Sequence, residues 1–408
     1  MGIIEKQFFF IIVFFFLIST ANSQQSSDCL NLQTIHPDSL YTDLKFLDNV
    51  LNNKAIIGVG ESTHGTSEFT IMRHRLFRYL VENFGFNTFF LEADYSGCRN
   101  INRYIHNEYP YADSALINQG LWLWMTTEMF DLIEWMKEFN ITHENRLNYV
   151  GCDMQSVLDD IKELSFLLKG NKQLSDSLVV MRGLVMSYLI EQKDCISDIR
   201  SMWNHIRADL LKIEHDKSLN FIIKTVEQWM DFHSLTGIKY NFRDSCMAEN
   251  MMSYLDQYPE SRAMYFAHNW HVAKKHFIYD NWPDKKSAGK FLSDKFNDKY
   301  YCIGQTSTEG EFNAVDESLS KFNITEFELN KPIKKSLELF FSKTNANYLY
   351  CFTSELPLNV KFYSSIGAQY QSPKKFHRDR RWITFDKNEF DAYIYIRKTK
   401  PSKLIYYK

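Results

Sequence analysis

Short apolar runs alternate with amphipathic stretches along this chain. Residues 55–60 are almost entirely apolar, which is typical of a strand buried on both faces of a sheet. Residues 66–84 then carry apolar side chains close to helical spacing, and Gly85 follows as a stop signal. A second apolar run covers residues 87–92. The pattern predicts a strand–helix–strand unit, whose two strands pair in parallel.

The same alternation continues to the end of the chain. Helices are predicted over residues 121–139 and 244–257, and the stretch 156–240 is helical in pattern throughout. Further strands are predicted at residues 147–153, 262–267, 300–304, 347–352 and 390–396. Strands separated by helices indicate an α/β fold with a largely parallel central sheet flanked by helices. We expect a helical insertion at about 156–258 that covers one sheet edge, without a linker or an internal repeat.

The first 23 residues have the pattern of a secretory signal peptide. Lys6 precedes an apolar core at residues 8–18, and Ala21-Asn22-Ser23 places small residues where a signal peptidase cleaves. The apolar core is short for a transmembrane helix, so an uncleaved anchor is the lesser alternative. We therefore expect a secreted or periplasmic protein that keeps no stable membrane partner after cleavage.

Composition narrows the class of protein further. The chain has 408 residues, of which 45% are apolar and 24% charged, as in ordinary globular proteins. A net charge of −3 gives no electrostatic reason to expect nucleic acid as a partner. Export permits disulfides among the seven cysteines. However, Cys152, Cys302 and Cys351 fall in apolar runs and are interpreted as buried free thiols, and without a CxxC pair no thiolate zinc site is predicted.

Polar residues gather where three of the predicted strands end. Glu61 and His64 follow the first strand, Glu92 ends the second, and His268 and His271 follow the strand at 262–267. Because ligands of open α/β sheets bind outside the carboxyl ends of the strands, we expect these side chains to meet at one edge. Arg73, on the helix behind the first loop, lies beside the apolar stripe of that helix rather than opposite it.

This set of residue types suits hydrolysis. A neutral histidine can take a proton from water, a carboxylate can fix its tautomer, and a cation or second histidine can meet the charge on a carbonyl oxygen. A usual α/β serine hydrolase is disfavoured because the sequence has no G-x-S-x-G elbow. Two alternatives use the same residues. One is a metal-dependent hydrolase, with His268 and His271 as chelating ligands; the other is an exported protein that binds a metal or haem without catalysis.

Five motifs, in order, resemble those of the erythromycin esterase family. The first is Gly60-Glu61-Ser62-Thr63-His64-Gly65, with Arg73 nine residues after the histidine and Phe90-Leu91-Glu92 further on. The others are Gly151-Cys152-Asp153-Met154-Gln155, the stretch from Arg243 to Asn250, Ala267-His268-Asn269-Trp270-His271, and the closing Phe390-Asp391-Ala392. Together they span roughly 330 residues, which makes the resemblance far more specific than any single motif.

The resemblance implies a hydrolase without metal or cofactor that opens a macrolide lactone with a water activated by His64. Residues 24–408 would form one catalytic domain. Glu61, Arg73, Glu92, His268 and His271 match the family's other active-site positions, and the partner would be a small-molecule ester. The secretory signal sets this chain apart from a cytoplasmic antibiotic-resistance enzyme.

Asp153 and Arg243 are candidates for contact with the substrate, since both fall in motifs of the family. An alternative role is bracing of the cleft. For Arg243 and Asp244 bracing is preferred, because an Arg-Asp pair at a helix start commonly serves as a cap and ion pair.

Overall fold

The computed structural model describes residues 29–212, 217–236, 239–274, 276–279, 282–371 and 382–405. The predicted signal peptide, residues 1–23, lies outside the described residues. Within the described part of the chain, no helix has both the length and the apolar character needed to cross a membrane.

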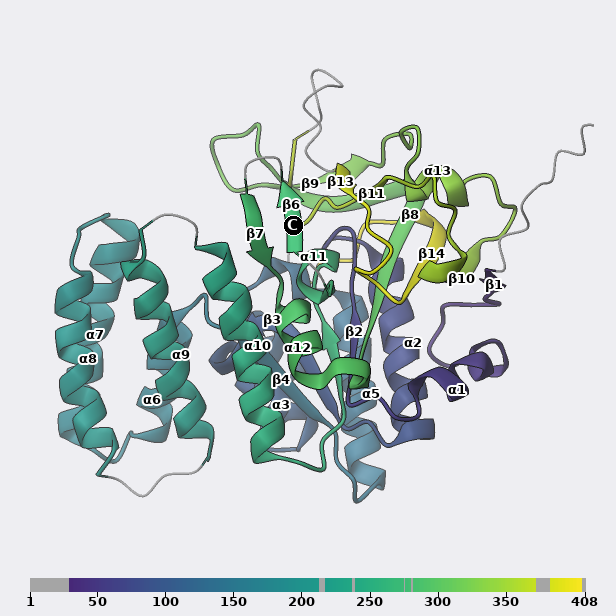
Figure 1. The fold of residues 1–408 in the computed structure, drawn as a ribbon. Helices are drawn as coiled ribbons and strands as arrows, with labels where there is room; N and C mark the ends of the chain where they lie inside the picture. Colours follow the sequence, from purple (N-terminus) through teal and green to yellow (C-terminus); the bar gives the residue numbers. More distant parts are fainter. Residues whose placement is uncertain are drawn as a thin grey trace, which may run out of the picture.

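A large mixed sheet forms the centre of the fold and carries helices on both faces (Figure 1). In spatial order its strands are β1 (Leu30–Asn31), β10 (Tyr348–Phe352), β14 (Ala392–Thr399), β8 (Tyr300–Asp316), β2 (Ile56–Val59), β5 (Ala263–Phe266), β3 (Thr88–Asp94) and β4 (Asn148–Asp153). All neighbours from β14 to β4 are parallel, while β10 is antiparallel to both β1 and β14. The predicted α/β class with a largely parallel sheet is confirmed.

The two faces of the sheet explain why the strands are apolar without alternation. Ile56 and Phe90 belong to the core beneath α10 (Tyr240–Gln257) and α12 (Ala288–Phe296). Their chain neighbours Ile57 and Leu91 belong to the opposite core, which α2 (Ser67–Phe84) and α5 (Thr127–Thr142) cover. Each strand therefore contributes to two buried layers.

The predicted helical insertion lies between β4 and β5. It consists of α6 (Val157–Leu167), α7 (Lys172–Ile190), α8 (Ile196–Leu210), α9 (Lys217–Ser234) and α10. Figure 1 shows α6–α9 as a group beside the β4 edge, with α10 between them and the sheet. Asn250 of α10 donates to the backbone oxygen of Cys152 in β4 at 3.0 Å, so the insertion is attached to the edge strand by a buried hydrogen bond.

The remaining elements are short. The other helices are α1 (Asp48–Leu51), α3 (Tyr95–Ile105), α4 (Ala112–Asn118), α11 (Asn269–Val272) and α13 (Leu337–Phe341), with 3-10 turns at Thr42–Leu47, Trp122–Trp124, Asn297–Lys299 and Thr353–Glu355. The other strands are β6 (His276–Tyr279) with β7 (Trp282–Lys286), β11 (Phe362–Ser364) with β13 (Trp382–Thr384), and β9 (Ile324–Glu328) and β12 (Gln369–Tyr370), which both pair with β8.

Two expectations from the sequence are wrong. Cys351 is not a free thiol, because it forms a disulfide with Cys29. Strand β1 pairs antiparallel with β10 so that Leu30 lies opposite Tyr350, which brings the two cysteines together. The apolar run around Cys351 indicated a buried strand but carried no information about a partner 322 residues away. Cys152 and Cys302 are buried free thiols, as predicted.

The second error concerns the start of helix α10. It begins at Tyr240 rather than at Arg243-Asp244. These two residues therefore lie inside the helix, and they do not cap it.

Candidate active site

The predicted site residues come together at the carboxyl edge of three adjacent strands. Strand β5 lies between β2 and β3 in the sheet, so the residues that follow these strands are neighbours. Glu61 and His64 follow β2, Glu92 lies within β3, and His268 is the residue before α11. The parallel order of the strands thus produces the cluster that the sequence predicted.

The loop after β2 is held by close backbone contacts. Its glycines are required because a Cβ at Gly60 would collide with Asn269, and a Cβ at Gly65 would collide with the backbone of Asn313. Asn269 is fully buried and donates its backbone N–H to the Glu61 carbonyl oxygen at 2.8 Å. Its side-chain oxygen accepts from the Gln305 backbone at 3.1 Å, which links the loop to β8.

Glu61 joins a histidine to an arginine. Its Oε1 lies 2.8 Å from Nδ1 of His64, and its Oε2 lies 3.1 Å from Nη2 of Arg73. A carboxylate at Nδ1 places the histidine proton there, so Nε2 keeps its lone pair. Within the described residues, His64 Nε2 has no hydrogen-bond partner. Glu61 is completely buried, whereas His64 is 7% exposed.

Arg73 lies behind Glu61 and is sealed from solvent. Its guanidinium packs over the ring of Phe266, and it donates to Thr70 Oγ1 at 2.7 Å and to the Phe69 carbonyl oxygen at 3.1 Å. Burial lowers the pKa of Arg73 to about 9, while the charge of Glu61 acts in the opposite direction. Arg73 therefore stabilises the carboxylate and does not reach the open side of His64.

His268 lies beside His64, with ring centroids 5.2 Å apart. Its Nδ1 accepts the backbone N–H of Trp270 at 3.4 Å, and its Nε2 lies 3.4 Å from the carbonyl oxygen of Ser62. Because a carbonyl only accepts, the ring proton sits on Nε2. Burial, together with the nearby His64, lowers the pKa of His268 to about 3, which makes this histidine a neutral donor.

Glu92 is part of a separate ionic network. Its Oε2 accepts the His268 backbone N–H at 3.0 Å, while Oε1 receives both Arg243 Nη2 at 2.8 Å and His271 Nε2 at 3.1 Å. The other ring nitrogen of His271 lies 2.7 Å from Asp244 Oδ1. His271 is therefore bound on both nitrogens.

The charges of this network shift the pKa values of its members in opposite directions. Burial opposes the charge on His271, but Asp244 and Glu92 raise its pKa to about 9. Burial also opposes the charge on Glu92, yet His271 and Arg243 hold its pKa well below the ordinary value. The raised pKa favours the protonated form of His271 at neutral pH, which disfavours a role as base there.

Arg243 and Asp153 are directed toward each other. The arginine contacts both carboxylate oxygens of Asp153, with Nε at 3.2 Å from Oδ1 and Nη2 at 2.5 Å from Oδ2. Asp153 also accepts from the Met154 backbone and is completely buried. The side chain of Arg243 is 16% exposed. These contacts favour bracing, although by ion pairs to Glu92 and Asp153 rather than by a helix cap.

The two histidines of the A-H-N-x-H motif bind different partners. His268 faces His64 and Ser62, whereas His271 is held between Asp244 and Glu92. The chelating pair that the metal alternative requires is not formed. Among the residues that the structure describes, no three His, Cys, Asp or Glu side chains converge as metal ligands.

Two contributors were missed by sequence reasoning. Trp124 is fully buried, packs edge-on against His64 at 5.6 Å between ring centroids, and donates to the Glu92 carbonyl oxygen at 3.2 Å. Its aromatic-rich surroundings in the sequence were a usable signal. Ser365 lies 3.3 Å from His268 Nε2 and comes from the segment after β11. Nothing in its local sequence marks it.

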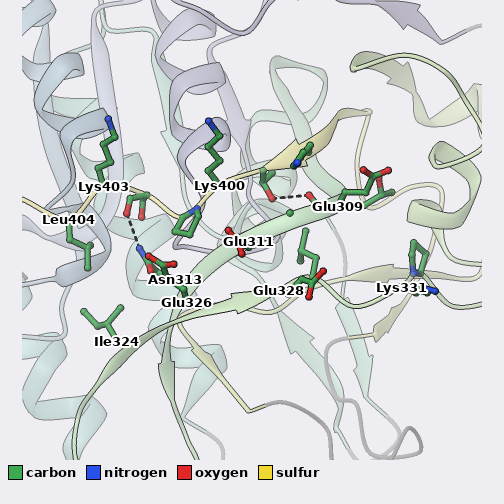
Figure 2. A pocket seen from close by; sticks show the side chains of 18 of the residues that line it. Glu309, Glu311, Asn313, Ile324, Glu326, Glu328, Lys331, Lys400, Lys403 and Leu404 are labelled. Atoms are coloured by element: carbon green, nitrogen blue, oxygen red, sulfur yellow. Dashed lines mark hydrogen bonds between the residues drawn. The ribbon is translucent and has the colours of Figure 1, made fainter.

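A large cavity lies elsewhere, between the β8–β9 hairpin and the chain end (Figure 2). Its volume is about 1100 Å³, with Glu311, Glu326 and Glu328 along the hairpin and Lys400 on the opposite segment. Asn313, in its lining, is the residue against which Gly65 packs. The catalytic candidates do not line this cavity, so it is not the place where they would meet a substrate.

The fold and site define an α/β protein with a buried histidine–carboxylate–arginine centre at the carboxyl edge of a parallel sheet. The sequence profile of the erythromycin esterase family matches residues 81–399, and the chain belongs to this family. The match begins after the loop that carries Glu61 and His64. The roles of these two residues therefore rest on geometry and on the motif itself.

Several known proteins are similar to this chain. It is 21% identical to the erythromycin esterase type II of Escherichia coli, over 91% of this chain and 96% of that protein. It is 22% identical to the putative hydrolase YbfO of Bacillus subtilis strain 168, over 68% and 70% of the two chains. These relatives are consistent with hydrolase activity in this family.

Solved structures share the fold. A protein described as a succinoglycan biosynthesis protein superposes with a TM-score of 0.78 at 24% identity, over 93% of this chain and 96% of that chain. A mutant of the erythromycin esterase EreC in its open conformation gives 0.69 at 17% identity, over 93% and 99%. At these identities the likeness concerns the fold.

Proposed function

We propose that this protein is a hydrolase that cleaves a carboxylic ester, with His64 as the general base for water. The observation that carries the proposal is the pairing of His64 Nδ1 with Glu61 at 2.8 Å, which leaves Nε2 as a base. Glu61 fixes the tautomer and stabilises the imidazolium that forms, and Arg73 holds Glu61 from behind.

The reaction then follows from the position of one proton. His64 Nε2 takes a proton from water while the water oxygen bonds to the ester carbonyl carbon. The tetrahedral intermediate collapses with cleavage of the bond to the leaving alcohol. The proton on Nε2 passes to that alcohol oxygen, so the enzyme returns to its starting state and no cofactor is consumed.

We propose a cyclic ester of a small molecule as the substrate, with a macrolide lactone as the first candidate. Support comes from two relatives in Escherichia coli described as erythromycin esterases of type II and type I, each 21% identical to this chain. The experiment is a hydrolysis screen of the mature protein across macrolides and simple esters, followed by mass spectrometry. The expected product is the opened lactone, whose mass is greater by one water. If the protein hydrolysed none of the esters, the proposal would be overturned.

We also propose that the protein acts outside the cytoplasm after removal of residues 1–23. The apolar core at 8–18 and the small residues at 21–23 support this. Mass spectrometry of protein from the native secretory route should place the mature N-terminus near Gln24. An intact Met1 in a membrane fraction would contradict it.

A further inference from the structure

The segment after β11 lies directly on the loop after β2, which carries Glu61 and His64. Ile366 donates its backbone N–H to the Ser62 carbonyl oxygen at 2.7 Å, and His64 donates its backbone N–H to Gly367 at 3.3 Å. These bonds hold Ser365 close to His268. In the sequence, Ser365 is 97 residues from His268 and about 300 residues from His64. The position of this segment is therefore part of the site's construction.

Ser365 presents a hydroxyl to His268. Its Oγ lies 3.3 Å from His268 Nε2, and the residue is 9% exposed. Because Nδ1 of His268 accepts the Trp270 N–H, the ring proton is on Nε2 and points toward Ser62 and Ser365. The Ser365 oxygen is thus an acceptor in this pair. Its own proton has no acceptor among the described residues.

The reaction needs a hydrogen-bond donor for the ester carbonyl oxygen, and the cations of the site do not supply one. Arg73 is sealed behind Glu61, and Arg243 and His271 are bound to the carboxylates of Glu92, Asp153 and Asp244. A carbonyl oxygen that becomes an oxyanion requires a hydrogen-bond donor fixed in advance. The Ser365 hydroxyl is a donor with this freedom, and it lies 3.3 Å from His268, whose ring centroid is 5.2 Å from that of His64.

We propose that Ser365 is a further catalytic residue, whose hydroxyl donates to the ester carbonyl oxygen as it becomes an oxyanion. His268 Nε2–H donates to the Ser365 oxygen and polarises this hydroxyl. The inference rests on the proposed esterase function and adds a residue to it. Ser365 is not assigned as a nucleophile, because the nitrogen that faces it already carries a proton.

The test compares Ser365→Ala, Ser365→Thr and the neighbouring Ser364→Ala on the ester that the wild-type enzyme hydrolyses fastest in the screen. Loss of one oxyanion donor lowers turnover by about 10²-fold. We expect that fall in kcat for Ser365→Ala with little change in KM, most of it restored in Ser365→Thr, and no comparable fall in Ser364→Ala. Thermal midpoints measured on the same samples separate a catalytic loss from misfolding.

Three outcomes overturn the proposal. A folded Ser365→Ala enzyme with wild-type kcat would remove Ser365 from the mechanism while leaving the esterase function intact. An acyl group found on Ser365 by mass spectrometry after rapid quenching would make it a nucleophile instead. A wild-type enzyme that hydrolyses no ester would refute the proposed function, and the role of Ser365 would fall with it.

Discussion

His64 and His271 both bind carboxylates, yet they differ in how many of their ring nitrogens are bound. His64 binds one carboxylate through Nδ1, and its Nε2 has no partner in the described part of the chain. His271 is bound by Asp244 on one nitrogen and by Glu92 on the other. Residue type therefore does not decide which histidine can exchange a proton. What decides it is the number of ring nitrogens that are already bound to other groups of the protein.

The same contrast extends to the two arginines. Arg73 supports the carboxylate that orients His64, while Arg243 pairs with Asp153 and with Glu92, the carboxylate that also binds His271. In the first half of the site the charge pair of Arg73 and Glu61 supports His64 through one nitrogen, and the other nitrogen has no partner in the described part of the chain. In the second half the charges satisfy one another, which favours a structural role.

The largest expected effect comes from removal of the proposed base. His64→Asn keeps approximate size and some hydrogen bonding but cannot take a proton. Since general-base catalysis contributes about 10²–10⁴-fold, kcat should fall by at least about 10²-fold with little change in KM. The measurement is steady-state kinetics with a thermal midpoint on the same sample. A folded variant with near wild-type turnover would assign His64 a packing role.

The buried pair behind His64 should matter next, mainly for stability. Arg73→Met removes the only cation paired with Glu61 in the described part of the chain and leaves this buried carboxylate with the N–H of His64 alone, which costs about 3–5 kcal/mol of unfolding free energy. The double variant Glu61→Gln with Arg73→Met removes both charges and should recover much of that loss. Urea titrations of the wild type and the variants test this. If the double variant is as unstable as the sum of the single changes, the pair is not coupled.

His271 should give a smaller effect that depends on pH. Its folded-state pKa of about 9 lies above the ordinary 6.5, so its stabilising contribution is complete below pH 6.5 and is lost as pH rises through about 9. The shift corresponds to a contribution on the order of 3 kcal/mol. The gap in unfolding free energy between wild type and His271→Asn should therefore shrink between pH 6.5 and 9. A gap that stays constant over this range would contradict a bound imidazolium.

The smallest expected effect is that of chelation. The carboxylates of Glu61 and Glu92 already pair with Arg73 and Arg243, and we expect the proton chemistry at His64 to need no ion. Activity should survive dialysis against a strong chelator. Loss of activity that one equivalent of zinc restores would support the metal-dependent alternative instead.

Sequence reasoning was most successful where local pattern and topology act together. The apolar runs indicated strands buried on both faces, and the ends of parallel strands indicated where Glu61, Glu92 and His268 would meet. The position of Arg73 beside an apolar stripe already agreed with its burial. For these features, the hydrophobic pattern and the order of the elements along the chain were sufficient for the prediction.

The remaining features depend on long-range contacts that leave no local signal. Ser365 meets His268 only because the segment after β11 binds the loop after β2. Similarly, the occupation of both nitrogens of His271 depends on where α10 places Asp244. A single sequence shows that such residues exist, but their pairing is decided by the packing of distant elements.

The cross-link between Cys29 and Cys351 imposes an order of events on synthesis. Its two cysteines are 322 residues apart, one in front of the first described strand and the other near the end of the chain. The bond can form only after residue 351 has been synthesised, and the pairing of β1 with β10 holds the two cysteines together in the folded chain. A cross-link that closes so long a loop restricts the unfolded chain, and it therefore stabilises the sheet against detachment of its outer strand.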